Sequence, residues 1–468
     1  MSALAPLGWF LATALVFVAA LGRPFADPDV LIYGEIGRAI YERGLLPYEW
    51  AFDHKPIAAY YIYGLAAVLL PLHWPQFQIL CLLVFLLTAY LTRDLVARGS
   101  YGLHLFLISV LSFKFLKFSG NTEAIFLLLA LASFWALIRM AGRGGLVASG
   151  LLAACAFHVN YLACFVIGPA ALFLLATREP GGGWIGFLRR LGFYVLGFLA
   201  GWLLVFLPFL LKDPSLIASY FVAQMGFLSG YQSRLDATES VKFLSYLLPL
   251  LLLLWVCRRP APGFERLHRM GWIAWISAWV GTLLSVRFYP HYAFPLAVLA
   301  VFLWLVSEHP RRKVFMAVTV AILALSPIKY GIGMLKSIPE IRQAYDFSPY
   351  EQVKAMVGDE PVLAVRASHI PFYYARIVPS QPMIWSDHAA IRYREAEDAY
   401  YLSYLNRQPL WVMMARGRCE GAYEMGMPET CHQLRRGYEH VMTLDEKYHD
   451  RIDLYRMAMP LPMTAEDL

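Results

Sequence analysis

Charged residues are scarce in this chain. Asp, Glu, Lys and Arg make up only 16% of its 468 residues, against about 25% in an ordinary soluble domain. Hydrophobic residues make up 59%. So little charge leaves too little polar surface for a soluble globule, and the composition excludes a soluble protein. We therefore expect a membrane protein.

Several other signatures are missing. The sequence has no glycine-rich loop that would hold nucleotide phosphates and no compact run of metal ligands. We therefore predict no organic cofactor and leave a divalent metal open. No internal repeat relates two halves of the chain, which weighs against a transporter built from repeated halves. The apolar run 7–21 lacks the basic region and cleavage site of a removable signal peptide, so we expect a retained first membrane span.

Cysteine is also rare, with six residues in the chain. Four of the six lie in or at the ends of apolar runs, where a free cysteine behaves as a small apolar residue. Cys419 and Cys431 are the only two in the C-terminal part, with eleven residues between them. We predict a disulfide between them in an oxidising compartment, and two unrelated thiols are the alternative.

The charge that is present is unevenly distributed. Residues 1–336 hold 26 basic and 14 acidic residues, whereas residues 337–468 hold 14 basic and 19 acidic ones. We therefore predict a membrane domain over 1–336 and a small soluble α/β domain over 337–468. Within the second domain, the sequence predicts short strands at 361–365 and 409–414. Helical spacing predicts helices at 350–357 and 392–405.

Eleven apolar runs have the character of membrane spans, at 7–21, 77–91, 103–116, 125–138, 146–157, 162–176, 191–211, 243–256, 272–286, 292–306 and 314–333. Alternate loops between them hold 14 basic and only four acidic residues, which assigns these loops to the cytoplasm. The opposite, periplasmic face then carries the acidic tail and the outer segments 22–56, 120–123, 158–161, 212–242 and 287–291. A further apolar run, 57–72, would break this alternation if it crossed. We therefore expect an interfacial helix there, and a true crossing is the alternative.

Acidic residues gather on the predicted outer face. Six of the 14 acidic residues of the membrane domain lie in the first outer loop, 22–56. Asp27 and Asp29 precede a helical run at 30–42, where a carboxylate either caps the helix or takes a proton from an attacking hydroxyl. Glu123 is an isolated acid at the start of a span. This position favours a polar cavity over lipid, and a first-turn capping role is the alternative.

Basic residues accompany these acids on the same face. His54 and Lys55 precede the interfacial helix, Lys117 ends a span, and Arg287 and His291 lie in a late outer turn. Each residue alone is explained by an anchor that interacts with lipid headgroups. Together with the acids they form a constellation suited to a phosphate and to hydroxyl groups.

In this order the motifs resemble the GT-C superfamily of polyprenyl-phosphate-sugar-dependent glycosyltransferases. Within it, the branch of protein O-mannosyltransferases and lipid A aminoarabinose transferases is the most similar. The likeness covers nearly the whole chain and lies in four stretches: Pro28-Asp29 with Tyr33-Gly34-Glu35-Ile36, Asp53-His54-Lys55-Pro56, Thr122-Glu123, and Arg287-Phe288-Tyr289-Pro290-His291-Tyr292. It implies an α-helical polytopic membrane fold with about 11 transmembrane helices and a small C-terminal extracytoplasmic α/β domain.

The resemblance also implies roles for single residues. Asp29 corresponds to the catalytic aspartate, Glu123 to a second catalytic acid and Lys55 to the basic residue near the donor phosphate. The remaining residues expected to bind substrate are Asp27, Tyr33, His54, Lys117, Arg287 and His291. The chain departs from the pattern at Val30, where many relatives are acidic, and at Ile32, where the aminoarabinose transferases carry Arg. The resemblance therefore does not assign the sugar.

The implied function is inverting transfer of one hexose or pentose from a polyprenyl-phosphate-linked donor to an acceptor hydroxyl. The expected acceptor is lipid A, lipopolysaccharide or another cell-envelope glycan at the periplasmic face of a bacterial inner membrane. We predict the donor lipid, the glycan acceptor and the membrane as partners, and no nucleic acid. One alternative is a non-enzymatic lipid or polysaccharide exporter, which predicts polar residues along the spans. The other is a ligase that moves a glycan from a diphosphate carrier.

Overall fold

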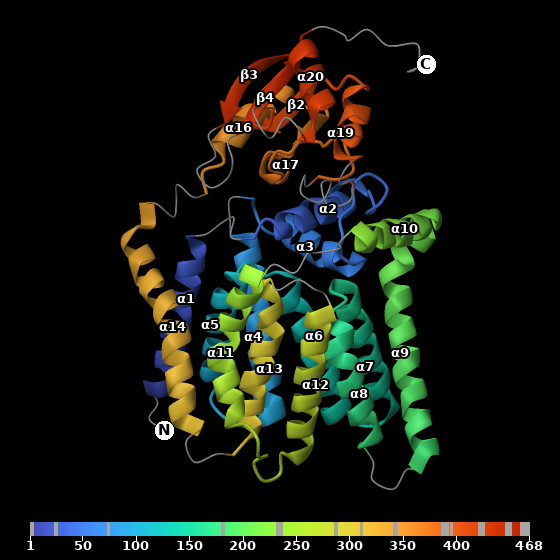
Figure 1. Cartoon of the computed structure of the whole chain (residues 1–468). Helices are drawn as coiled ribbons and strands as arrows, with labels where there is room; N and C mark the ends of the chain where they lie inside the picture. The colour runs from blue at the N-terminus through green and yellow to red at the C-terminus, as the bar shows by residue number, and fades with distance from the viewer. Residues whose placement is uncertain are drawn as a thin grey trace.

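The computed structural model of the chain describes residues 4–22, 27–72, 75–178, 183–230, 237–284, 289–308, 312–339, 345–384, 393, 396–419, 426–444 and 452–458. These residues form an α-helical bundle and a smaller α/β domain stacked on one end of it (Figure 1). The first helix of the chain begins at the opposite end of the bundle.

Within the described residues, a helix of the bundle corresponds to each of the eleven apolar runs expected to span the membrane. These helices are α1 (Leu4–Leu21), α4 (Gln76–Val96), α5 (Tyr101–Leu116), α6 (Thr122–Arg139), α7 (Gly142–Val159), α8 (Ala163–Ala176), α9 (Gly183–Lys212), α11 (Ala237–Trp255), α12 (Glu265–Leu284), α13 (Ala293–Val306) and α14 (Arg312–Lys336). Five of them, α4, α6, α7, α9 and α14, contain at least 18 described residues and are apolar enough to cross a membrane. The chain is therefore a multi-pass membrane protein, as its composition predicts.

Small residues let neighbouring helices of the bundle approach closely. At the contact of α7 with α9, a Cβ added at Gly150 would lie 1.9 Å from the carbonyl oxygen of Tyr194. A Cβ added at Gly197 would lie 2.0 Å from the carbonyl oxygen of Val147. Such contacts are typical of membrane helices, whose association depends on close van der Waals packing.

Three further helices lie at the end of the bundle that faces the α/β domain (Figure 1): α2 (Asp29–Arg43), α3 (Ile57–Leu69) and α10 (Ser215–Gly230). Helix α3 is the run that we expected at the interface, and it lies next to α2 outside the bundle. Helix α10 was not predicted, because the expectation for 212–242 was only an outer segment.

The crossing of α2 and α3 depends on two glycines. A Cβ added at Gly37 would lie 2.0 Å from the carbonyl oxygen of Tyr60 and 2.6 Å from the Cα of Gly64. We expect Gly37→Ala to separate the two helices and to destabilise the protein by about 1–3 kcal/mol or more. Gly192→Ala in α9 is the matched control, because nothing lies within 4 Å of the added Cβ. Thermal unfolding in detergent should show a lower Tm for the first variant only, and equal Tm values would contradict this account of the crossing.

The α/β domain is built on a sheet of four strands among its described residues. Its elements are α16 (Ser348–Val357), β1 (Val362–Val365), α17 (Ile370–Tyr374), α19 (Glu397–Leu405), β2 (Trp411–Ala415), α20 (Pro428–Gly437), β3 (Tyr438–Leu444) and β4 (Ile452–Met457). The strand order is β1-β2-β4-β3, with β1 and β2 parallel and the other pairs antiparallel. Strands β1 and β2 lie where the sequence predicts strands, whereas β3 and β4 were not predicted.

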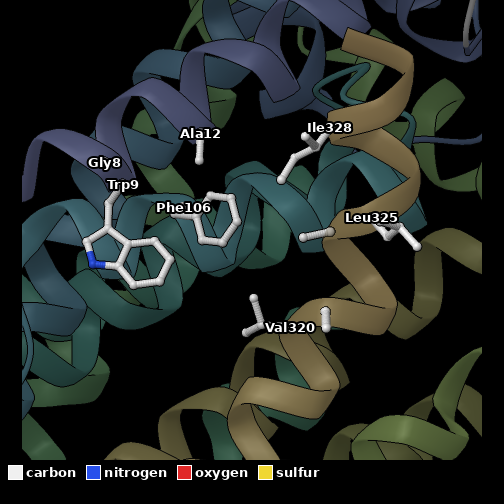
Figure 2. A pocket seen from close by; sticks show the side chains of 9 residues that line it. Gly8, Trp9, Ala12, Phe106, Val320, Leu325 and Ile328 are labelled. Carbon is white, nitrogen blue, oxygen red and sulfur yellow. The ribbon is translucent and has the colours of Figure 1, made fainter. Parts of the chain in front are cut away.

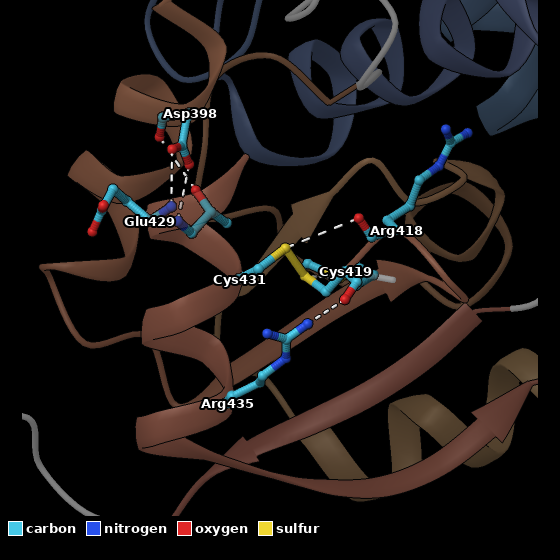
Figure 3. Close-up of a disulfide and its surroundings, with 8 residues drawn as sticks. Asp398, Arg418, Cys419, Glu429, Cys431 and Arg435 are labelled. Carbon is cyan, nitrogen blue, oxygen red and sulfur yellow. Dashed lines mark hydrogen bonds between the residues drawn. A yellow bond between two sulfur atoms is a disulfide. The ribbon is translucent and has the colours of Figure 1, made fainter. Parts of the chain in front are cut away.

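A disulfide joins Cys419, which follows β2, to Cys431 in α20 (Figure 3). Arg435 donates a hydrogen bond to the carbonyl oxygen of Cys419 across the same junction. The Asp398 carboxylate accepts the backbone N–H groups at the start of α20, at 3.0 Å from Glu429 N and 2.9 Å from Thr430 N. The disulfide and this cap together fix α20 against the rest of the domain.

Candidate active site

The first turn of α2 presents Asp29. The residue before the helix is Pro28, which has no capping side chain, and Asp27 Oδ1 instead accepts the backbone N–H of Asp29 at 3.2 Å. The half-buried Asp29 side chain accepts a hydrogen bond from the Tyr33 hydroxyl at 3.2 Å through its Oδ2. Asp27 Oδ1 therefore caps the first turn of α2, and Asp29 Oδ2 is the acceptor for Tyr33.

The turn between α5 and α6 holds Asp27 in place. Asn121 Nδ2 donates to Asp27 Oδ2 at 2.6 Å, and the Ser119 hydroxyl donates to the same oxygen at 3.2 Å. Lys117 and Phe118 adopt left-handed backbone conformations, with φ of 52° and 59°. This conformation costs non-glycine residues about 1–2 kcal/mol each. The turn thus carries backbone strain while it places two donors against Asp27, which the sequence predicts only as a substrate-binding residue.

Glu123, in the first turn of α6, is fully buried. Asn160 Nδ2 donates to its Oε1 at 3.0 Å, and the Thr122 hydroxyl lies 3.3 Å from its Oε2. Lys55 interacts with it electrostatically. Asn121 caps the same helix by accepting the Thr122 N–H at 2.6 Å. Asn121 is therefore the N-cap, and the first-turn Glu123 accepts a backbone hydrogen bond as well as those of its polar neighbours, so the capping alternative applies to part of this carboxylate.

Lys55 brings a buried cation to these acids. Lys55 is only 6% exposed, and its Nζ lies 5.9 Å from the centroid of the Tyr33 ring. Its backbone carbonyl accepts the Tyr60 hydroxyl at 3.1 Å and Gln224 Nε2 of α10 at 3.4 Å. The loop before α3 is therefore anchored from two helices, which holds the ammonium group beside Tyr33 and Glu123.

His291 lies beside the same groups. It belongs to a short 3-10 helix, η1 (Pro290–Tyr292), and interacts electrostatically with Lys55, Asp27 and Lys117. Burial and then the positive charge of Lys55 lower the pKa of His291 far below its usual value. Asp27 acts in the opposite direction, and Lys117 lowers the pKa further. The lowered pKa favours the neutral imidazole, which offers an N–H donor without charge. Lys117 is exposed.

The remaining two predicted site residues are His54 and Arg287. His54 Nδ1 lies 2.9 Å from Asp53 Oδ1, and its ring stacks on Phe227 of α10 at 5.1 Å between centroids. Its described contacts therefore link the first outer loop to α10. Arg287 lies outside the described residues.

The α/β domain also contacts α2. His369 Nε2, just before α17, lies 2.8 Å from the carbonyl oxygen of Pro28. Arg38 Nη1 of α2 donates to the carbonyl oxygen of Tyr373 at 3.0 Å, and the Tyr373 hydroxyl donates to Gln76 Oε1. The residues joined by these contacts are 341, 335 and 297 positions apart in the sequence. No local sequence signal predicts them.

Sequence reasoning also missed contacts closer to the acids. Asn121 and Ser119 hold Asp27, and Gln224 holds the backbone of Lys55. Gln224 is buried in the apolar helix α10. A buried amide normally needs hydrogen-bond partners, so the one amide side chain of 215–230 was a usable signal.

Glu35, on α2, makes this region sensitive to pH. It is buried and pairs with Arg38, and Arg43 lies 3.8 Å away. Burial raises the pKa of Glu35 from 4.5 to about 7, although both arginines lower it. The folded pKa is above the unfolded one, so its contribution to stability is fully present below pH 4.5 and is lost as the pH rises through 7.

We therefore expect Glu35→Gln to remove one pH-dependent part of the stability. The Tm of the variant minus that of the wild type should rise between pH 5 and pH 8. The underlying change in unfolding free energy is at most about 3 kcal/mol. Thermal unfolding in detergent across this range measures the difference, and parallel Tm curves for the two proteins would contradict the shifted pKa.

An apolar groove of about 540 Å³ lies between α1, α5 and α14 (Figure 2). Trp9 and Phe106 line one side of it, and Val320, Leu325 and Ile328 line the other. It contains none of the predicted site residues. Among the described residues, no group of three or more His, Cys, Asp or Glu side chains is placed to hold a metal ion.

Comparisons with known proteins give a likeness of fold. No family model matches the chain, and no curated protein matches it in sequence. The structure is similar to two crystal structures of ArnT from Cupriavidus metallidurans, each with a TM-score of 0.55. The apo structure is 13% identical, with 97% of this chain and 99% of that chain covered. The structure bound to undecaprenyl phosphate is 15% identical, with 96% and 97% covered. At such identity the likeness shows the fold alone. The chain therefore has an ArnT-like fold, that of a polytopic helical membrane protein with a C-terminal domain, as expected.

Proposed function

We propose that the protein transfers one sugar from a polyprenyl-phosphate carrier to an acceptor hydroxyl. The observation that carries the proposal is the buried Lys55, which lies beside Tyr33, the hydrogen-bond donor to Asp29, at one end of a membrane bundle. A buried cation at the end of the bundle is suited to bind the phosphate of a lipid carrier. A half-buried carboxylate is suited to accept the proton of a hydroxyl group. ArnT, which has a similar fold, has been crystallised bound to undecaprenyl phosphate.

In the proposed reaction, Asp29 is the general base. Its carboxylate takes the proton of the acceptor hydroxyl while the hydroxyl oxygen forms a bond to the anomeric carbon. The bond between that carbon and the phosphate oxygen breaks, and its electron pair leaves with the polyprenyl phosphate. A single displacement of this kind inverts the anomeric configuration. Tyr33 orients the base, and it remains a protonated donor because burial and then Asp29 raise its pKa well above 10.

Positive charge and N–H donors would stabilise the leaving phosphate. We assign this role to Lys55, with Lys117, Arg287 and the neutral His291 as further donors. Glu123 is buried and bound by Asn160. In this proposal it acts by holding Lys55 in position before the donor arrives. Lys55 is buried, and in such a dehydrated place its interaction with phosphate is stronger than in water.

The acceptor and the location follow from the resemblance in sequence motifs. We propose a glycolipid or another cell-envelope glycan as acceptor, at the periplasmic face of a bacterial inner membrane. The disulfide between Cys419 and Cys431 supports an oxidising compartment for the α/β domain. The identity of the sugar is left to experiment.

The test uses purified protein in detergent with cell-envelope glycolipid as acceptor. Short-chain polyprenyl monophosphates and diphosphates that carry different sugars are the donors, and mass spectrometry follows the acceptor. We expect one monophosphate donor to increase the acceptor mass by a single sugar. Transfer from diphosphate donors alone would replace the proposal with a ligase. No transfer, together with carrier lipid crossing liposomes that contain the protein, would replace it with an exporter.

A further inference from the structure

The α/β domain reaches the backbone atom at which α2 begins. His369 is 3% exposed, and its Nε2 lies 2.8 Å from the carbonyl oxygen of Pro28. The same oxygen accepts the N–H of Leu31 at 3.1 Å, a hydrogen bond within the first turn of α2. Because a carbonyl oxygen only accepts, the imidazole must carry its proton on Nε2. His369 therefore donates to the peptide group that directly precedes Asp29.

Helix α17, which follows His369, packs on α2 without spare room. A Cβ added at Gly34 would lie 2.7 Å from the ring of Phe77 and 2.8 Å from the ring of Tyr373. One turn further, the Arg38 guanidinium donates to the carbonyl oxygen of Tyr373. The α/β domain thus holds α2 at its first residues and again in its middle, which leaves little freedom for the helix to slide or rotate.

This restraint acts at the position of the proposed base. Pro28 supplies no side-chain cap, so the first turn of α2 depends on Asp27 and on the partner of the Pro28 carbonyl oxygen. Asp29 is the next residue, and its hydrogen-bond donor Tyr33 lies one turn along the same helix. Proton transfer is sensitive to the position of the base, because a misplacement of about 1 Å lowers the rate about 100-fold.

We propose that His369 is a positioning residue. By donating to the Pro28 carbonyl oxygen it fixes the first turn of α2 and orients Asp29 towards the acceptor hydroxyl. The α/β domain is then a working part of the active site, although His369 touches no substrate. This inference rests on the proposed sugar transfer for its catalytic consequence and on the structure for its mechanical one.

Three variants separate the hydrogen bond from simple packing. His369→Phe keeps a ring but has no donor. His369→Gln keeps an amide N–H at about the place of Nε2, and His369→Asn is too short to reach the carbonyl oxygen. His432→Phe is the matched control, because His432 is an exposed histidine on α20 of the same domain.

The first readout needs no activity. Hydrogen exchange measured by mass spectrometry on peptides covering 27–36 reports the opening of the first turn of α2. We expect the Phe and Asn variants at 369 to exchange faster, by about five- to tenfold for one lost hydrogen bond. The Gln variant and the control at 432 should exchange like the wild type. Unchanged exchange in both the Phe and Asn variants would overturn the proposal, whether or not the protein transfers sugar.

The second readout is transfer with the donor identified by the assay above. We expect kcat to fall about tenfold or more in the Phe and Asn variants, with KM for the donor unchanged and kcat restored in the Gln variant. Faster exchange with unchanged kcat would overturn the catalytic role of His369. If the wild type transfers no sugar, the proposed function fails, and the exchange result alone decides whether His369 holds the turn.

Discussion

Asp29→Asn is expected to lower sugar transfer by a factor of about 10²–10⁴, the usual contribution of a general base. The amide has nearly the same shape as the carboxylate and still accepts the Tyr33 hydroxyl, which donates to Asp29 Oδ2 at 3.2 Å in the structure. It cannot take the proton of the acceptor. The fold, the Tm and the affinity for polyprenyl phosphate should therefore stay close to those of the wild type.

The control for this variant is Asp359→Asn in the α/β domain. Asp359 pairs with Lys354 and has a fully exposed side chain, so its removal should leave transfer unchanged. If transfer survives in Asp29→Asn, the base lies elsewhere. Asp27 and Glu123 are then the next carboxylates to substitute, and both are hydrogen-bonded to neighbouring side chains.

Lys55→Met is expected to damage both stability and donor binding. Removal of the ammonium group leaves the buried Glu123 carboxylate without this cation. Loss of this favourable interaction between two buried groups should lower the Tm. The same change removes the proposed phosphate ligand, so binding of farnesyl phosphate, a short polyprenyl phosphate, should fall below detection in a tritium-label assay.

A second substitution separates the two effects. Lys55→Met combined with Glu123→Gln removes the uncompensated charge, so the double variant should regain most of the lost Tm and still fail to bind the lipid phosphate or to transfer sugar. Lys354→Met is the control for loss of a lysine, since Lys354 pairs with Asp359 at the surface. Recovery of lipid binding in the double variant would contradict the role of Lys55 as a phosphate ligand.

The sequence predicted the helices of the bundle because each membrane span is a continuous run of apolar residues. It also predicted α2, observed at Asp29–Arg43, from its helical spacing. It missed α10 because a short helix at the bundle end has no hydropathy signature that separates it from a loop containing apolar residues. It missed β3, whose middle residues are exposed, so that the strand lacks the apolar alternation that identifies a half-buried strand.

For the candidate site, the sequence predicted residue types better than their partners. Asp29, Lys55 and Glu123 stand out because each charge is unusual in an apolar chain. The structure adds that Asp27 is held by the turn after α5, and that the surroundings of His291 lower its pKa. The bond from His369 to Pro28 spans 341 residues of sequence. A contact of this kind depends on how the two domains pack, and a single sequence holds no local pattern for it.

The most direct test of sugar transfer follows both substrates in one reaction. Wild-type protein and the Asp29→Asn variant are incubated with the polyprenyl monophosphate donor and the glycolipid acceptor, and mass spectrometry quantifies the freed carrier and the glycosylated acceptor. We predict that the wild type releases one polyprenyl monophosphate for each sugar gained by the acceptor, and that both products are lost in Asp29→Asn. Carrier release without gain by the acceptor, or equal product in the two proteins, would contradict an Asp29-dependent glycosyl transfer.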